Sequence, residues 1–111
     1  MAADTTRAAR ASDYTNDAQQ RMVKLILALF SDPVQGLPPS VLAREVGCSP
    51  QVMTRDLDNA RTAGIAERDE ATGLWRLTPR LPQQAIKVLN AVDAEQRRVD
   101  EIRNRFTRNP D

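Results

Sequence analysis

The sequence contains no histidine and only one cysteine, Cys48. Zinc sites built from cysteine and histidine are therefore excluded, as are the common Cys–His and Ser–His pairs of nucleophilic enzymes. Neither a Walker loop nor a GxGxxG stretch is present, and the carboxylates lie among arginines in segments that we expect to be helix surfaces. We therefore expect no enzyme, no metal and no cofactor.

Long apolar runs are also absent. The longest covers residues 25–30, far short of the roughly 20 residues that span a bilayer. No apolar segment directly follows Arg7 and Arg10, so the N-terminus is unlike a secretory signal. A lone cysteine cannot form an internal disulfide and suits a reducing compartment. These features predict a cytoplasmic protein with no membrane partner.

An excess of charge of one sign is missing too. The chain has 16 basic and 15 acidic residues, and residues 37–80 hold six arginines against six acids. Nucleic-acid-binding domains usually show a basic footprint, because neutralising phosphates supplies much of their affinity. A single copy is therefore expected to bind nucleic acid weakly, and two copies on one site would compensate.

The N-terminal part combines an arm with one helix. Residues 1–13 are small and polar without periodicity, and they predict a disordered arm. A helix is expected to begin at Thr15 or Asn16, either of which can cap it, and to end before Pro33. Its buried stripe is predicted from apolar residues at helical spacing: Met22, Val23, Ile26, Leu29 and Phe30.

Two further helices are predicted on either side of a tight turn. Ser40 is expected to cap the first, and Gly47 to stop it. Ser49 followed by Pro50 marks the start of the second, which runs to about residue 63. The inward residues of the first are predicted to be Val41, Leu42, Ala43 and Val46. The second is predicted to turn Met53, Leu57 and Ala60 inward and Gln51, Thr54, Arg55 and Asp58 outward.

A short hairpin follows these helices. Strands are expected at residues 65–69 and 74–78, joined by the four residues 70–73, with Gly73 in the turn. Trp75 and Leu77 share one strand face, and Arg76 lies on the other. The predicted fold class is therefore mainly α with a small β-hairpin wing, a winged helix-turn-helix at residues 14–80 that is followed by a C-terminal helix.

Residues 81–108 show a helical pattern again. Apolar residues recur at steps of three, four or seven, but Glu95 and Gln96 interrupt the pattern, so one long helix and two shorter ones both fit. The stripe exceeds what a detached surface helix needs, which favours packing against a second copy. The alternative is folding back onto the first helix of the same chain. The residues expected to mediate dimerisation are Val92, Val99, Ile102 and Phe106.

Two segments carry a resemblance to a known family. Residues 42–57, LAREVGCSPQVMTRDL, are similar to the helix-turn-helix of many bacterial winged-helix repressors. Residues 64–68, GIAER, and 72–81, TGLWRLTPRL, resemble the wing of the N-terminal domain of IclR-type transcriptional regulators. The resemblance covers about residues 19–90. It implies a protein that inserts its third helix into the major groove of double-stranded DNA.

Carried over by motif position, the resemblance implies particular contacts. The third helix would present Gln51, Thr54 and Arg55 to the major groove, where glutamine suits adenine and arginine suits guanine. Ser49 would either cap this helix alone or both cap it and face a phosphate. In the wing, Arg68 and Arg76 are the residues expected to contact DNA.

Acidic residues oppose that expectation. Asp56 and Asp58 lie in the third helix, and Asp69 and Glu70 lie beside the wing arginines. Winged helices also serve as protein-interaction modules, and the balanced charge fits that alternative.

The expected function is a small dimeric, sequence-specific DNA-binding regulator of transcription, of bacterial or phage origin. IclR-type regulators carry an effector domain after the linker helix, whereas this chain stops at Asp111. No small-molecule effector is therefore expected.

Overall fold

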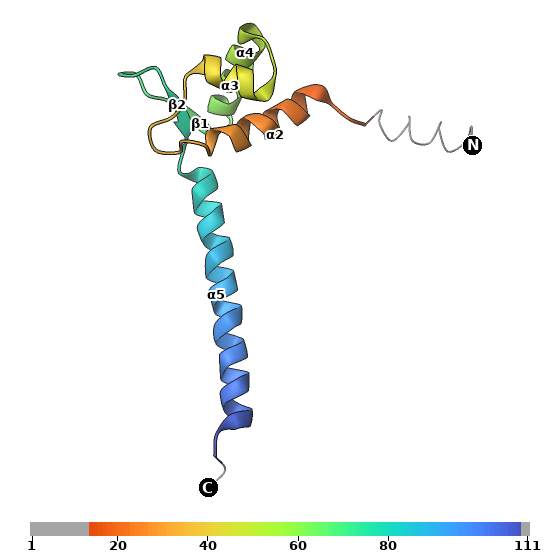
Figure 1. Ribbon diagram of the computed structural model, residues 1–111, viewed down its shortest axis with the longest axis vertical. Helices are drawn as coiled ribbons and strands as arrows, with labels where there is room; N and C mark the ends of the chain where they lie inside the picture. Colours follow the sequence, from red (N-terminus) through yellow and green to blue (C-terminus); the bar gives the residue numbers. More distant parts are fainter. Residues whose placement is uncertain (1–13, 110–111) are drawn as a thin grey trace, which may run out of the picture. The chain divides into compact units, whose positions relative to one another are not determined.

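The computed structural model describes residues 14–109. These residues form four helices and one antiparallel pair of strands (Figure 1). In chain order the elements are α2 (Asp17–Leu29), α3 (Pro39–Val46), α4 (Pro50–Thr62), β1 (Ala66–Arg68), β2 (Trp75–Leu77) and α5 (Arg80–Thr107). The prediction of a mainly helical protein with a small hairpin is confirmed. The predicted arm, residues 1–13, lies outside the described residues.

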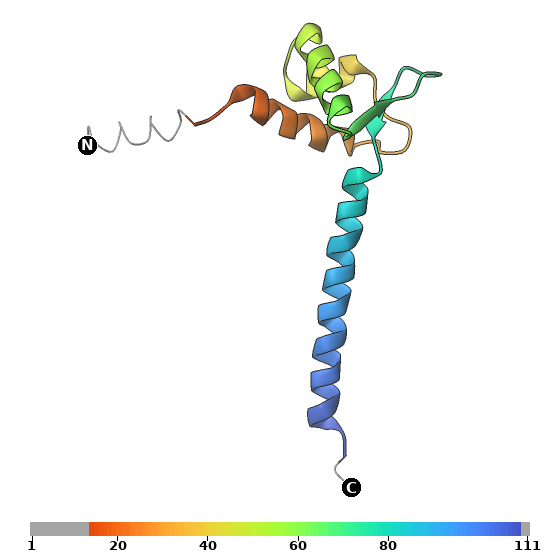
Figure 2. The ribbon, with the colours of Figure 1, turned by 180° about the vertical axis from the view of Figure 1, so that it is seen from behind.

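The chain divides into two compact units, one ending at Thr78 and the other beginning at Pro79. In the first unit α2 packs on α3, α3 packs on α4, and the hairpin contacts α2 and α4. Figures 1 and 2 show the three helices gathered together and the loop of the hairpin pointing away from them. The largest fully buried side chains form its core: Leu25, Leu29, Leu42, Met53 and Leu57. Each contributes roughly 2 kcal/mol through removal of apolar surface from water.

Helix α2 begins as predicted, but its buried stripe differs from the prediction. The Asn16 side chain accepts a hydrogen bond from the Gln19 N–H at 3.0 Å. Leu25, absent from the predicted stripe, is fully buried, whereas Val23 and Phe30 are exposed. At 100° per residue, Val23 and Phe30 lie about 150° around the helix from Leu25. The predicted stripe was therefore wrong at Val23 and Phe30, which lie outside the side of the helix that α3 and β2 cover, whereas Leu29 is buried as predicted.

The predicted cap of α3 is also wrong. The helix begins at Pro39, one residue before Ser40, and its N-cap residue Pro38 offers no side-chain bond. Proline suits the first helical position, because its φ is already helical and its missing N–H would have no partner there. Gly47 ends the helix as predicted, with a φ of +84° and its N–H donating to the Ala43 carbonyl.

The two strands are shorter than predicted, at three residues each, and six residues connect them. Ala66 pairs with Leu77 and Arg68 with Trp75. Trp75 and Leu77 are both buried, as predicted for one strand face.

The hairpin has a third partner that the sequence did not reveal. The Leu37 N–H donates to the Trp75 carbonyl at 2.8 Å, and the Trp75 N–H returns a bond of 2.9 Å. Gly36, with a φ of +94°, leads into this bridge. A Cβ at Gly36 would lie 2.6 Å from the Trp75 carbonyl oxygen. Only glycine therefore fits where the α2–α3 connection meets β2.

The second unit consists of α5, which is a single helix of 28 residues. Of the two alternatives left by the sequence, the continuous helix is the one observed (Figure 1). Pro82 lies in its first turn, where proline is tolerated. None of its residues is buried within the chain. Among residues 14–109, no helix combines the length and the apolar character needed to cross a membrane.

Candidate nucleic-acid interface

The turn between α3 and α4 sets the start of α4. Gly47 adopts the left-handed conformation, and the Cys48 N–H donates to the Ala43 carbonyl at 3.0 Å. Ser49 is extended, and its Oγ accepts a hydrogen bond from the Val52 N–H at 3.2 Å. Pro50 follows at the first helical position. The predicted capping role of Ser49 is confirmed, while its phosphate contact stays a prediction.

Helix α4 has one buried and one exposed face. Met53, Leu57 and Ala60 are buried as predicted. The four residues predicted to point outward are all exposed: Gln51, Thr54, Arg55 and Asp58.

The exposed face keeps its polar groups available. Gln51 and Arg55 are one helical turn apart, so their side chains emerge on the same side. The Thr54 hydroxyl donates to the Pro50 carbonyl at 3.0 Å, which leaves its methyl group and oxygen lone pairs toward solvent. Arg55 forms no ion pair with any residue of the range 14–109.

Asp56 does not belong to this exposed face, contrary to the concern raised by the sequence. Its residue surface is 6% exposed, and it faces Arg21 of α2. The Arg21 Nη2 donates to Oδ1 at 3.1 Å, and Nε donates to Oδ2. The hydrogen bond to Asp56 raises the pKa of Arg21 above its ordinary value, so the guanidinium stays charged. The negative charge of Asp56 is therefore turned inward and neutralised.

Asp58 is exposed but paired. Its carboxylate accepts a hydrogen bond from Arg61, three residues further along α4. The Arg61 guanidinium also lies over the Trp75 ring, 5.6 Å from its centroid. Within residues 50–57, the first two turns of α4, the one exposed charge is consequently that of Arg55. The partial positive charge of the helix N-terminus adds to it.

The hairpin arginines differ in how firmly they are held. Arg76 donates from Nε to Glu67 at 3.0 Å and from Nη1 to Asp69 at 3.1 Å. These two bonds raise the pKa of Arg76. The pKa of Asp69 is lowered mainly by hydrogen bonds from the backbone N–H groups of Ala71 and Thr72, with a smaller contribution from Arg76.

Arg68 is less constrained than Arg76. Its side chain is 43% exposed and lies 3.3 Å from the Glu70 carboxylate, which is itself 83% exposed. The DNA contacts expected of Arg68 and Arg76 stay predictions.

The predicted dimerisation residues lie on α5 and are all exposed. Val92, Val99, Ile102 and Phe106 have between 48% and 74% of their surface accessible. The Arg105 guanidinium lies over the Phe106 ring, 4.8 Å from the ring centroid.

Two further properties concern possible metal ligands and the hydrogen bonding of buried polar groups. Across residues 14–109 no three His, Cys, Asp or Glu side chains gather as a metal site would require. In the same part of the chain, every buried side-chain nitrogen or oxygen has a hydrogen-bond partner. These residues thus hold no orphaned buried group that calls for a ligand.

Comparison of the chain with models of protein families, with curated proteins and with solved structures finds no match. The resemblance to IclR-type regulators stays a prediction.

Proposed function

We propose that this chain is a winged helix-turn-helix protein that binds double-stranded DNA and reads its sequence with α4. One observation carries the proposal. The first two turns of α4 expose Gln51, Thr54 and Arg55, and the acid beside them, Asp56, is held inward by Arg21. A helix that presents such side chains near its N-terminus matches the hydrogen-bonding pattern of a major groove.

The side chains suggest individual contacts. Gln51 is suited to a bidentate bond with adenine and Arg55 to one with guanine, each worth roughly 1–3 kcal/mol of discrimination. The Thr54 methyl group is suited to the methyl of thymine. The Ser49 hydroxyl and the Gln51 N–H would face a phosphate in this arrangement, because the Val52 N–H already donates to Ser49 Oγ.

The hairpin serves as the wing, with unequal roles for its arginines. Arg76 is shared by two carboxylates, so a phosphate would have to displace them. Arg68 has one exposed partner at 3.3 Å, and such surface pairs are weak. We therefore assign the main wing contact to Arg68.

Two copies acting together would compensate for the weak attraction of one copy, whose basic and acidic residues nearly balance. Residues 14–78 carry seven basic and eight acidic side chains, so a single unit attracts DNA weakly at long range. A dimer doubles the contacts on one duplex. We assign dimerisation to the exposed stripe of α5, and a dimeric regulator of transcription is the function that follows.

The dimer has its own test. The double variant Val99→Asp with Ile102→Asp should sediment as a monomer, because it places charges in the stripe. Asn90→Asp with Asn104→Asp adds the same charge elsewhere on α5 and should leave the mass of the dimer unchanged. A dimer that survives the first pair of substitutions would refute the role of the stripe.

A protein-interaction module is the second candidate. The observation that favours it is the mixed charge of the hairpin, where Arg68 and Arg76 each meet carboxylates. In that case α4 and the hairpin would face a protein surface.

NMR titration of the ¹⁵N-labelled chain with a mixed-sequence duplex at low salt distinguishes the two candidates. DNA binding predicts shifts concentrated at the amides of residues 49–55 and near Arg68, and these shifts should reverse as salt is added. Arg61, paired at the other end of α4, provides the internal comparison and should move less. No shifts at low salt, or shifts confined to other surfaces, would refute the proposal.

A further inference from the structure

We infer that two copies of this chain pair through α5 in antiparallel orientation, as a two-stranded coiled coil. The inference specifies the partner of the stripe and rests on the dimer of the proposed function. It does not depend on DNA, and its test contains none.

The first step is the spacing of the stripe. Alternating steps of four and three residues along α5 select one face of the helix, and every residue on it but one is apolar. These steps select Leu81, Ala85, Val88, Val92, Glu95, Val99, Ile102 and Phe106. This is a heptad pattern sustained for nearly four repeats, which is the length that indicates a coiled coil. We call this face the seam.

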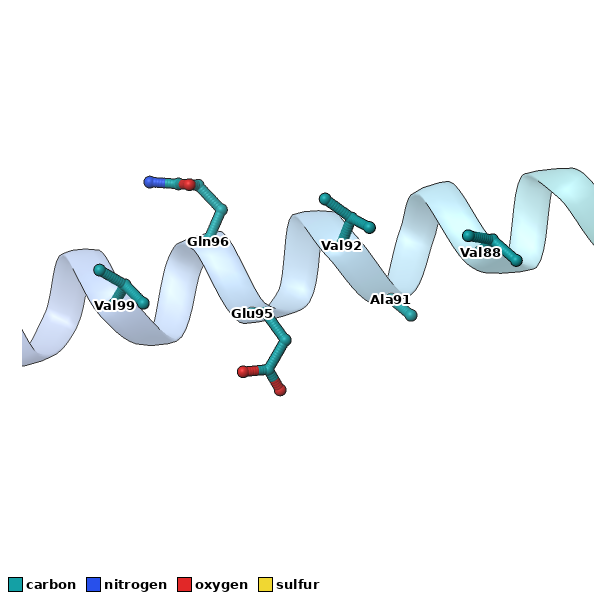
Figure 3. A pocket seen from close by; sticks show the side chains of 6 residues that line it. All are labelled: Val88, Ala91, Val92, Glu95, Gln96 and Val99. Carbon is teal, nitrogen blue, oxygen red and sulfur yellow. The ribbon is translucent and has the colours of Figure 1, made fainter.

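The middle of the seam is an open apolar surface. Figure 3 shows Val88, Val92 and Val99 along the helix, with the side chain of Gln96 projecting to one side and that of Glu95 to the other. These valines are 55% to 62% exposed. The whole seam, from Leu81 to Phe106, is nearly 40 Å long, and apolar side chains left in water over that length favour burial against a second helix.

Charges beside the seam argue against a parallel pair. In the C-terminal half the flanking positions hold Arg98, Arg103 and Arg105, whereas the flanking positions before them are uncharged. A parallel coiled coil would bring Arg98 of each copy beside Arg103 of the other. It would also place the two Glu95 carboxylates at the same level inside the seam. Both contacts are repulsive.

The antiparallel pair removes the arginine contact and offsets the two Glu95 residues along the axis. With the seams fully overlapped, Arg98 lies opposite Ala91 of the second copy, and Arg105 lies opposite Gln84. Glu95 then lies at the level of Val92, so the two Glu95 residues are offset by three residues, about 4.5 Å along the axis, instead of lying in the same layer. Its carboxylate also keeps the ion pair with Arg98 of its own helix, at 3.4 Å.

Side-chain size agrees with the same register. The seam ends in Ile102 and Phe106, its largest residue, and begins with Leu81, which equals Ile102 in size, and the much smaller Ala85. Full antiparallel overlap places Ile102 opposite Ala85, and Phe106 opposite Leu81. The layer of Ile102 and Ala85 then sets a large side chain against a small one, as well-packed interfaces do, and Phe106 packs against Leu81 at each end.

Distances between spin labels on the full chain test the orientation. In a Cys48→Ser background, Gln83→Cys and Asn104→Cys each place one label per copy on the side of α5 away from the seam. In the antiparallel pair, residue 83 of one copy lies level with residue 104 of the other. The two labels at position 83, or the two at position 104, are therefore offset by 21 residues of helix, and we expect them to be about 30 Å or more apart. Asp93→Cys lies at the midpoint and should give a separation roughly 10 Å shorter than the other two.

Sedimentation equilibrium of the same samples, without DNA, decides whether the distances refer to a dimer. A dimer with long distances at positions 83 and 104 and a short one at 93 supports the inference. Short distances at all three positions would show a parallel pair and overturn it. A monomer, or any other mass, would overturn it as well. None of these outcomes changes the NMR test of α4, so failure of the pairing and failure of DNA binding are distinguishable.

A charge reversal gives an independent check. In a parallel pair Arg103→Glu would turn repulsion with Arg98 into attraction, and the dimer would bind more tightly. In the antiparallel pair position 103 lies near Pro82, so we expect the dimer Kd to change by less than about fivefold. Tightening beyond that range would contradict the antiparallel arrangement.

Discussion

Substituting alanine at Gly36 and at Gly47 separates two reasons for which a glycine is needed. Both residues have a positive φ, +94° at Gly36 and +84° at Gly47. Alanine in this left-handed region costs roughly 1–2 kcal/mol at either position. The surroundings differ, because a Cβ at Gly47 would meet nothing within 4 Å.

At Gly36 the added carbon would lie 2.6 Å from the Trp75 carbonyl oxygen and 2.9 Å from its carbon. These are backbone atoms that cannot rotate away, so the bridge between Leu37 and Trp75 must open. Loss of its two hydrogen bonds adds about 1 kcal/mol each. We therefore expect Gly36→Ala to cost roughly 3–4 kcal/mol against roughly 1–2 kcal/mol for Gly47→Ala.

Urea denaturation followed by tryptophan fluorescence measures both values. Trp75 is the one tryptophan of the chain and lies in the bridge, so the signal reports this part of the fold. For a domain of this size each kcal/mol lowers the Tm by roughly 4–8 °C, so thermal melts provide a second reading. Equal losses for the two variants would refute the close approach of the α2–α3 connection to β2.

Three further predictions concern charged and capping residues. Asp56→Ala should lower the Tm much more than Asp58→Ala, because it leaves Arg21 without its buried partner while the Asp58 pair is exposed and worth under about 1 kcal/mol; equal melts would contradict the buried pair. Ser49→Asp should keep the cap and the Tm but weaken DNA binding by adding a negative charge at the phosphate position, whereas Ser49→Ala should cost about 1 kcal/mol of stability; unchanged affinity of the aspartate variant would argue against the phosphate contact. The folded-state pKa of Asp69 is depressed, so its charge stabilises the fold above its unfolded pKa of about 3.9, and this contribution is lost as the pH falls through the folded-state value. The stability difference between wild type and Asp69→Asn should therefore be present at pH 7 and shrink below about pH 4, and a difference independent of pH would refute the assignment.

Local signals in the sequence predicted the parts of the fold that depend on a few neighbouring residues. The cap at Asn16, the stop at Gly47 and the serine–proline start of α4 are all confirmed. Each rests on hydrogen bonds or dihedral angles within one helical turn. The exposed face of α4 followed from helical spacing for the same reason.

Contacts between distant segments were not predictable in this way. The Arg21–Asp56 pair joins residues 35 positions apart, and the Leu37–Trp75 bridge joins a loop to a strand. The burial of Asp56 could have been predicted, because Asp56 lies three residues after the buried Met53 and therefore on the same side of α4. The buried side of α2 depends on where α3 and β2 pack against it, and the sequence of α2 alone does not indicate that position.

Selection of bound duplexes from a random DNA library at low salt is the most direct measurement of sequence reading by α4. The wild-type chain should enrich one motif, with two-fold symmetry if the dimer binds it, and affinity for that motif should fall as salt rises. Arg55→Ala should enrich a motif that is degenerate at one position in each half, with a loss of roughly 1–3 kcal/mol on the original site and a smaller loss on other sequences. The absence of any enriched motif, together with no measurable binding at low salt, would contradict DNA recognition by this chain.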